Sequence, residues 1–310
     1  MVEIQRILCP IDFSEFSRHA LDHAVALARW YGSTITVLHV FSTTPVAVYA
    51  PGMPGFDPIV LTSADRDQLL VDLKRFVDTE SAPGVSTDVV IREGDAVGEI
   101  LSLATDMRAD LLVMGTHGRS GFERLLLGSV TEKLLRKASC PVLTVPRRHP
   151  DAVPATPVLF KEILCPVDFS DCSLQALNYA ISMAQEADAH LTVLHVMGNE
   201  LEVTPDAYGA IIMNDLESLA DFRRRQEEDA RKRLTEAVPE SVAAYCSVET
   251  MVSKGGTPSR EILRVAAEQQ SDVIVVGVQG RGAANLMFFG STTNHVVREA
   301  TCPVLTVRRS

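Results

Sequence analysis

The sequence predicts an α/β protein of two tandem domains, each a doubly wound sheet of five parallel strands with helices on both faces. Three observations lead to this fold class. The chain has 310 residues, whereas a single domain usually has about 100 to 200. Segments of the first half return in the same order in the second half. Within each half, short apolar runs alternate with longer stretches of helical period.

The repeat defines the domains. Because the repeated segments keep their order, a whole domain has been duplicated rather than a short solenoid unit. We expect domains at residues 1–146 and 162–310, joined by a proline-containing linker at 147–161. The repeated segments are Ile7–Ser14 with Ile163–Ser170, Thr36–Val40 with Thr192–Val196, and Cys140–Val145 with Cys302–Val307.

The elements of each half follow from the apolar pattern. In the first half, residues 6–12, 34–41, 86–92, 110–115 and 141–146 are expected to be strands, apolar on both faces as in a covered parallel sheet. Between the first two strands, apolar residues recur at helical spacing, as do their counterparts in the second half. These residues are Ala20, Leu21, Ala24, Val25 and Ala28, with Ala176, Leu177, Ala180, Ile181 and Ala184. The order β-α-β-α-β-α-β-α-β places a ligand at the carboxyl ends of the strands, where the winding reverses.

Composition limits the function classes. Apolar residues make up 46% and charged residues 22%, as in an ordinary globular protein. A net charge of -11 argues against nucleic acid as a partner. No apolar tract long enough for a membrane span and no secretory signal occur, so we expect no membrane association and a cytoplasmic location. The six cysteines form no CxxC pair, and we expect buried free thiols and no metal site.

A glycine pattern follows the fourth strand of each half. Both halves fit G-x2-G-x9-G-[ST], beginning at Gly115 and Gly277. Glycine lets a backbone approach a polyphosphate closely, and the helix that follows presents free amides to it. The alternative is purely structural, because glycines also close turns and Ser129 with Glu132 fits a capping box.

The repeated segments and the glycine pattern resemble the universal stress protein family over residues 4–145 and 162–307. The resemblance implies an adenine-nucleotide α-hydrolase-like fold. It places Asp12 or Asp168 beside adenosine and the backbone of Val40 or Val196 against adenine, while the glycine loop holds ribose and phosphates. The residues expected to bind nucleotide are Pro10, Ile11, Asp12, Val40, Met114, Gly115, Gly118, Arg119, Gly128, Ser129, Val130 and Thr131 in the first half. Those in the second half are Pro166, Val167, Asp168, Val196, Val276, Gly277, Gly280, Arg281, Gly290, Ser291, Thr292 and Thr293.

Several of these side chains have a second interpretation. Asp12 ends a strand, where its carboxylate can accept hydrogen bonds from ribose hydroxyls. Aspartate is also a preferred N-cap of a helix. Arg119 and Arg281 are either phosphate contacts or solvated loop residues.

The histidines are not expected to be catalytic. His39 and His195 are repeated inside apolar strands, where a hydrogen-bonded core histidine is the favoured interpretation. His117 lies in the glycine loop, where it can meet phosphate, but Gln279 replaces it in the second half, which excludes a role required in both.

Three functions are compatible with these observations. The favoured one is a nucleotide-dependent stress sensor or regulator that binds ATP, with or without Mg²⁺. The others are a slow ATPase and a partner-binding stress module without nucleotide. No catalytic residue is expected, because the Walker P-loop, SGGxDS and HxGH patterns are absent from the sequence. The resemblance also implies a dimer-like arrangement of the two halves and a homodimer.

Overall fold

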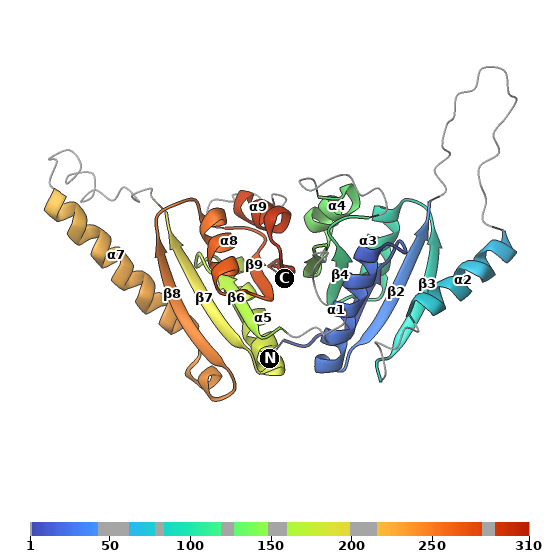
Figure 1. Ribbon diagram of the computed structural model, residues 1–310, viewed down its shortest axis with the longest axis horizontal. Coiled ribbons are helices and arrows are strands. Elements are labelled where there is room, and N and C mark those ends of the chain that lie inside the picture. The colour runs from blue at the N-terminus through green and yellow to red at the C-terminus, as the bar shows by residue number, and fades with distance from the viewer. Residues whose placement is uncertain are drawn as a thin grey trace, which may run out of the picture. The chain divides into compact units, whose positions relative to one another are not determined.

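The computed structural model describes residues 2–42, 62–77, 84–118, 127–147, 160–198, 216–280 and 289–309 (Figure 1). The chain divides into two compact units, which we call the first unit (Glu3–Val158) and the second unit (Leu159–Arg309). This division falls inside the stretch expected to be a linker. The detailed domain boundaries stay a prediction.

The first unit contains one parallel sheet. Its strands are β1 (Arg6–Pro10), β2 (Thr34–Phe41), β3 (Thr87–Glu93), β4 (Leu111–Gly115) and β5 (Val142–Val145), in the spatial order β3-β2-β1-β4-β5. All four pairings are parallel, and Leu8 of the central strand β1 aligns with Thr36 of β2 and Leu112 of β4. The predicted fold class is therefore confirmed for this unit.

Burial explains why these segments are strands. All five residues of β4 and the three central residues of β1 are buried, whereas only Ile91 is buried in β3 at the edge of the sheet. Strands covered on both faces need apolar residues at successive positions rather than at alternate ones. The uninterrupted apolar runs in the sequence follow from this requirement.

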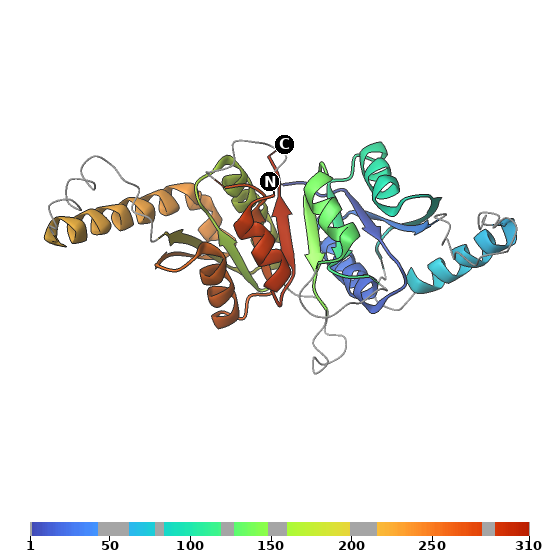
Figure 2. The same ribbon diagram turned by 90° about the horizontal axis from the view of Figure 1, so that it is seen from above.

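In the described part of the first unit, four helices cover the sheet. They are α1 (Glu15–Tyr31), α2 (Ser63–Val77), α3 (Ala96–Asp106) and α4 (Ser129–Lys137). Helix α1 packs against β1, β2, β4 and β5, whereas α3 and α4 pack against each other. Right-handed crossovers place helices on opposite faces when the winding direction reverses, and Figure 2 shows α1 on one side of the strands and α3 on the other.

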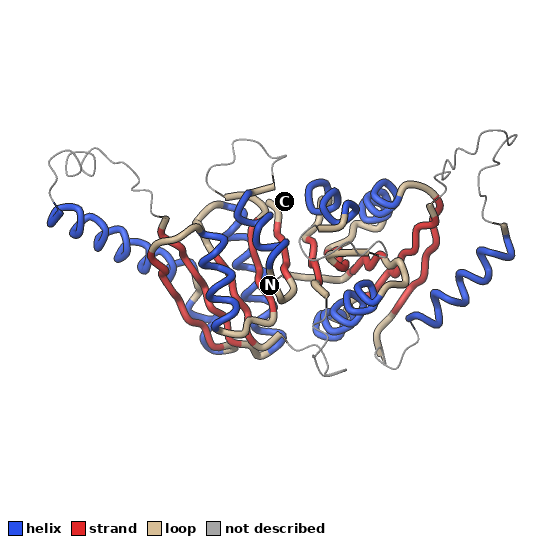
Figure 3. Tube along the Cα trace, turned by 45° about the horizontal axis from the view of Figure 1, so that its top comes forward, coloured by secondary structure: helices blue, strands red, loops and turns tan. Residues whose placement is uncertain are grey.

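The second unit repeats this architecture. Its parallel strands are β6 (Glu162–Pro166), β7 (His190–Met197), β8 (Ser247–Lys254), β9 (Val273–Gly277) and β10 (Val304–Val307), in the order β8-β7-β6-β9-β10. Its helices are α5 (Asp171–Ala187), α7 (Leu216–Ala237), η1 (Glu240–Ala244), α8 (Pro258–Glu268) and α9 (Ser291–Glu299). Figure 3 shows the strands in red and the helices in blue for each unit. Within the described residues, no helix is both long and apolar enough to cross a membrane.

Candidate functional site

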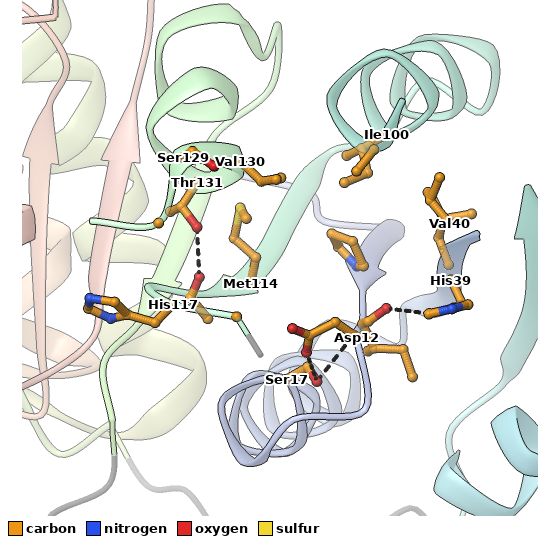
Figure 4. Close-up of a pocket in the computed structure, with 17 residues that line it drawn as sticks. Asp12, Ser17, His39, Val40, Ile100, Met114, His117, Ser129, Val130 and Thr131 are labelled. Carbon is orange, nitrogen blue, oxygen red and sulfur yellow. Dashed lines mark hydrogen bonds between the residues drawn. The ribbon is translucent and has the colours of Figure 1, made fainter. Parts of the chain in front are cut away.

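A pocket of about 350 Å³ opens in the first unit where the winding of the sheet reverses (Figure 4). From β1 the chain proceeds to β2 and β3 on one side, then returns to β4 and β5 on the other. The carboxyl ends of β1 and β4 therefore border a crevice, as is usual for ligand sites in doubly wound sheets. The pocket is lined by Pro10, Ile11, Asp12, Ser17, Leu38, His39, Val40, Ala96, Ile100, Met114, Gly115, His117, Gly118, Gly128, Ser129, Val130 and Thr131.

The structure gathers the predicted first-half residues in one place. Eleven of the twelve line this pocket. The twelfth, Arg119, lies outside the described residues. The sequence did not predict Ser17, Leu38, Ala96 or Ile100 as pocket residues, nor His39, which was expected in the core. Ala96 and Ile100 belong to the first turns of α3, which follows β3 at the same edge of the sheet, and this topological position is the signal that identifies them.

Asp12 supplies the carboxylate of the pocket. Its Oδ1 accepts hydrogen bonds from the Ser14 amide (3.1 Å), the Ser14 hydroxyl (2.5 Å) and the Ser17 hydroxyl (2.9 Å). The alternative interpretation of Asp12 as the N-cap of α1 is wrong. Ser14 is the N-cap, and its side chain accepts from the Ser17 amide. These hydrogen bonds anchor Oδ1 of Asp12, and Oδ2 lies on the side of Gly118.

The glycines of the pattern approach protein atoms closely. A Cβ on Gly118 would lie 2.7 Å from Asp12 Oδ2, and one on Gly115 would lie 2.9 Å from the Phe16 Cβ of α1. A Cβ on Gly128 would lie 3.1 Å from the Thr116 carbonyl oxygen. None of these three glycines has a positive φ. The pattern is therefore required sterically, to let the loop pass the carboxylate and α1, rather than for left-handed backbone.

Helix α4 begins at the pocket without a side-chain cap. Its N-cap is Gly128 (φ -56°, ψ 140°), and no side chain accepts a hydrogen bond at this cap. The interpretation of Ser129 and Glu132 as a capping box is wrong, because Ser129 is already the first helical residue and Glu132 pairs with Arg136 at 2.9 Å. Thr131 Oγ1 donates to the Gly115 carbonyl at 3.0 Å and ties the helix to the end of β4. The positive end of the helix dipole thus borders the pocket.

The opposite wall is apolar and comes from β2, α3 and β4. Figure 4 shows Val40, Ile100 and Met114 around the space between Asp12 and the start of α4. The pocket thus combines an apolar wall, one carboxylate and one helix N-terminus.

The two pocket histidines have different surroundings. His39 lies in the pocket wall and is partly exposed, with Nδ1 2.9 Å from the Ile11 carbonyl oxygen. It is hydrogen-bonded as expected, but it does not lie in the core. His117 Nδ1 lies 3.0 Å from the Thr116 hydroxyl, and Figure 4 shows its ring turned away from Asp12 and Val130. This orientation does not favour a contact between His117 and phosphate, which the position of His117 in the glycine loop had suggested.

The second unit repeats the same local geometry. Asp168 Oδ1 accepts from the Ser170 amide (3.0 Å) and hydroxyl (2.6 Å), and a Cβ on Gly280 would lie 2.5 Å from Asp168 Oδ2. Helix α9 begins after Gly290 without a side-chain cap, and Thr293 Oγ1 donates to the Gly277 carbonyl at 2.8 Å. The other predicted residues lie at the ends of β6, β7 and β9 or in the first turn of α9: Pro166, Val167, Val196, Val276, Ser291 and Thr292. Arg281 lies outside the described residues.

The family model of the universal stress proteins matches residues 3–146 and 159–308. The chain belongs to the universal stress protein family. It carries two such domains in tandem, as the resemblance implied. A Mycobacterium tuberculosis universal stress protein, Rv2005c, is 30% identical over 282 residues, which cover 89% of this chain and 88% of the relative. A Mycolicibacterium smegmatis universal stress protein is 26% identical over 97% of this chain and 96% of its own length.

Solved structures of this family share the fold. A universal stress protein from Archaeoglobus fulgidus covers 98% of this chain and 98% of its own, with a TM-score of 0.65 at 24% identity. This likeness concerns the fold alone. Another universal stress protein, solved in complex with cAMP, covers 47% of this chain at 22% identity with a TM-score of 0.35.

The cysteines lie in the core of each unit and not in the pocket. Cys9, Cys140, Cys165, Cys172 and Cys246 are buried free thiols, as expected, and Cys302 is partly buried. Burial raises the pKa of Cys9 to about 12 and that of Cys140 to about 11. In the described part of the chain, no three histidine, cysteine or acidic side chains are grouped as metal ligands.

Proposed function

We propose that this universal stress protein binds ATP in the pocket of the first unit and in the equivalent place of the second, and acts as a nucleotide-dependent regulator. The observation that carries the proposal is the meeting of Asp12, an apolar wall and the uncapped start of α4 in one pocket at the reversal of the sheet. Its volume of about 350 Å³ lies within the range of about 300 to 1,000 Å³ found for small-molecule sites.

Each part of the pocket fits one part of the nucleotide. The apolar wall of Val40, Ala96 and Ile100 suits an adenine ring. The Asp12 carboxylate suits ribose hydroxyls, which are hydrogen-bond donors. The start of α4 suits phosphates, since its first amides have no intrahelical partner and the dipole favours an anion. A local device of this kind is needed because the chain as a whole carries a net charge of -11.

Magnesium would enter with the phosphates. In the described residues, no three histidine, cysteine or acidic side chains are grouped as metal ligands. A magnesium ion would then be held mainly by the phosphate oxygens of ATP and by water. The proposal assigns no catalytic residue. Regulation would act through association, so we expect ATP to change the oligomeric state, measured by light scattering.

The binding proposal is tested with the full chain. Small molecules released by denaturing freshly purified protein are identified by mass spectrometry, and nucleotide-free protein is titrated calorimetrically with ATP, GTP and adenosine. We expect an adenine nucleotide among the released molecules and saturable binding of ATP that exceeds that of GTP. Absence of both would overturn the proposal in favour of a partner-binding module.

A matched pair of variants locates the site. In the chain carrying Asp168→Asn, Asp12→Asn should weaken the binding of ATP and of adenosine alike by about 10- to 100-fold, since a charge-assisted hydrogen bond contributes about 1.5 to 3 kcal/mol. Asp110→Asn is the control, because Asp110 pairs with the Arg6 guanidinium (2.9 Å) and accepts hydrogen bonds from the Gln5 and Arg6 backbone amides at the start of β1, at the opposite edge of the sheet. Equal nucleotide affinity in the Asp12 and Asp110 variants would show that the pocket is not the binding site.

A further inference from the structure

The residue after each site carboxylate has an unusual backbone. Phe13 has φ +64° and Phe169 has φ +63°. Bulky L-residues rarely adopt this left-handed conformation, which costs on the order of 1 to 2 kcal/mol. Backbone strain of this kind persists only where the surroundings enforce it, and it concentrates at functional sites. The outlier recurs in both units, each time directly after the site carboxylate, Asp12 or Asp168.

A histidine from the neighbouring strand enforces the turn. His39 on β2 has Nδ1 2.9 Å from the Ile11 carbonyl oxygen, and its ring centroid lies 4.8 Å from that of Phe13. A carbonyl oxygen only accepts, so Nδ1 carries the proton and donates. The Ile11 amide in turn donates to the Leu38 carbonyl at 2.8 Å. Strand β2 therefore holds Ile11, the residue before Asp12, through two hydrogen bonds, and contacts Phe13, the residue after it, through the His39 ring.

The second unit reproduces the arrangement closely. His195 Nδ1 lies 2.7 Å from the Val167 carbonyl oxygen, and its ring centroid lies 4.7 Å from that of Phe169. The Val167 amide donates to the Leu194 carbonyl at 2.7 Å. The same bonds recur although the helices that flank the two phenylalanines differ. Phe76 of α2 packs on Phe13, with ring centroids 5.6 Å apart, whereas the Arg233 guanidinium of α7 lies 4.0 Å from the Phe169 ring centroid.

We propose that His39 and His195 are positioning residues of the nucleotide sites. Each histidine clamps the turn between the first strand and the first helix of its unit, so that the carboxylate of Asp12 or Asp168 already faces the ligand before the ligand arrives. Such preorganisation raises affinity because the ordering cost is not incurred on binding. This inference rests on the proposed function and deepens it.

Substitutions at His39 separate the hydrogen bond from general stability. His39→Leu removes the donor. His39→Asn keeps it, because Asn Nδ2 is separated from Cα by the same number of bonds as His Nδ1. The control is His23→Leu, since His23 also has its Nδ1 close to a backbone carbonyl oxygen, that of His19 at 2.8 Å, and does not line the pocket. All variants are made in the full chain carrying Asp168→Asn, so that the titration reports the first site.

We expect His39→Leu to weaken ATP binding about three- to tenfold, which is the effect of losing one hydrogen bond. The ATP affinities of His39→Asn and His23→Leu should be close to that of the parent chain. Thermal unfolding of each variant shows whether the fold is retained. Affinity in His39→Leu equal to the parent, or equal weakening in the Leu and Asn variants, would overturn the positioning role while leaving the proposed function intact. If neither the parent chain nor the wild-type chain binds ATP, the proposed function is overturned, and this inference with it.

Discussion

Gly118→Ala should disable the first nucleotide site while leaving the first unit folded. The added Cβ would lie 2.7 Å from Asp12 Oδ2, whereas ordinary contact begins at 3.4 Å, so the carboxylate must retreat by about 0.7 Å. Among the described residues, the other contact within 4 Å is the Cγ of the same side chain, at 3.8 Å, so no described backbone atom has to move. Rotation of Asp12 strains the three hydrogen bonds to Oδ1, and we expect a stability loss of about 1 kcal/mol.

The loss of binding should be larger than the loss of stability. A carboxylate displaced from the ribose forfeits a charge-assisted hydrogen bond, which corresponds to about a 10- to 100-fold weaker ATP affinity. Calorimetric titration of the Gly118→Ala, Asp168→Asn chain against the Asp168→Asn parent measures this, and urea unfolding measures stability. Gly98→Ala in α3 is the control, because its Cβ would lie at an ordinary 3.5 Å from Asp95 Oδ2. Unchanged ATP affinity in Gly118→Ala would refute the link between loop glycine and carboxylate.

Three further predictions concern the sites and the core. The first site should bind ATP more tightly than the second, because the single hydrogen of the Ser170 hydroxyl is shared between Asp168 Oδ1 (2.6 Å) and the Gln279 carbonyl oxygen (3.2 Å), whereas the Ser14 hydroxyl donates to Asp12 Oδ1 at 2.5 Å. Tighter residual binding in Gly118→Ala than in Gly280→Ala would contradict this order. Native Cys9 and Cys140 should resist thiol reagents at pH 8, since burial raises their pKa values to about 12 and about 11; rapid labelling of either, mapped by mass spectrometry, would contradict it. Burial alone raises the pKa of Asp110, but hydrogen bonds from Arg6 and Gln5 outweigh it and lower the pKa below its usual value. The resulting stability is present above about pH 4 and lost as the pH falls through the lowered value, so Asp110→Asn should flatten the acid side of the stability profile measured by urea unfolding.

Much of the architecture could be predicted from the repeat and from the apolar runs. A strand that is buried on both faces needs apolar residues at successive positions, so its burial can be recognised in the local sequence. The strands appeared close to where they were expected, although β1 ends at Pro10 rather than at residue 12. The difference arises from the left-handed turn at Phe13, and no sequence rule favours that backbone for phenylalanine.

The caps show why local patterns alone were insufficient. Asp12 and Ser14 are both good N-caps two residues apart, and only the turn geometry assigns that role to Ser14 and frees Asp12 for the pocket. Ser129 and Glu132 have capping-box spacing, but the helix begins one residue too early for them to act. Ala96 and Ile100 line the pocket because of the place where α3 crosses the sheet. The spacing of residues along the chain does not determine that place.

The contact between a loop glycine and the carboxylate has an evolutionary consequence for a duplicated chain. One base change converts a glycine codon to an alanine codon, and at Gly118 or Gly280 the added Cβ would displace the neighbouring carboxylate, which under the proposed function weakens one of the two ATP sites. The two copies can therefore diverge in occupancy by a single step that largely spares the fold. A lineage carrying such a change in one half would retain one responsive domain and gain a constitutively unliganded one, free to acquire a separate role.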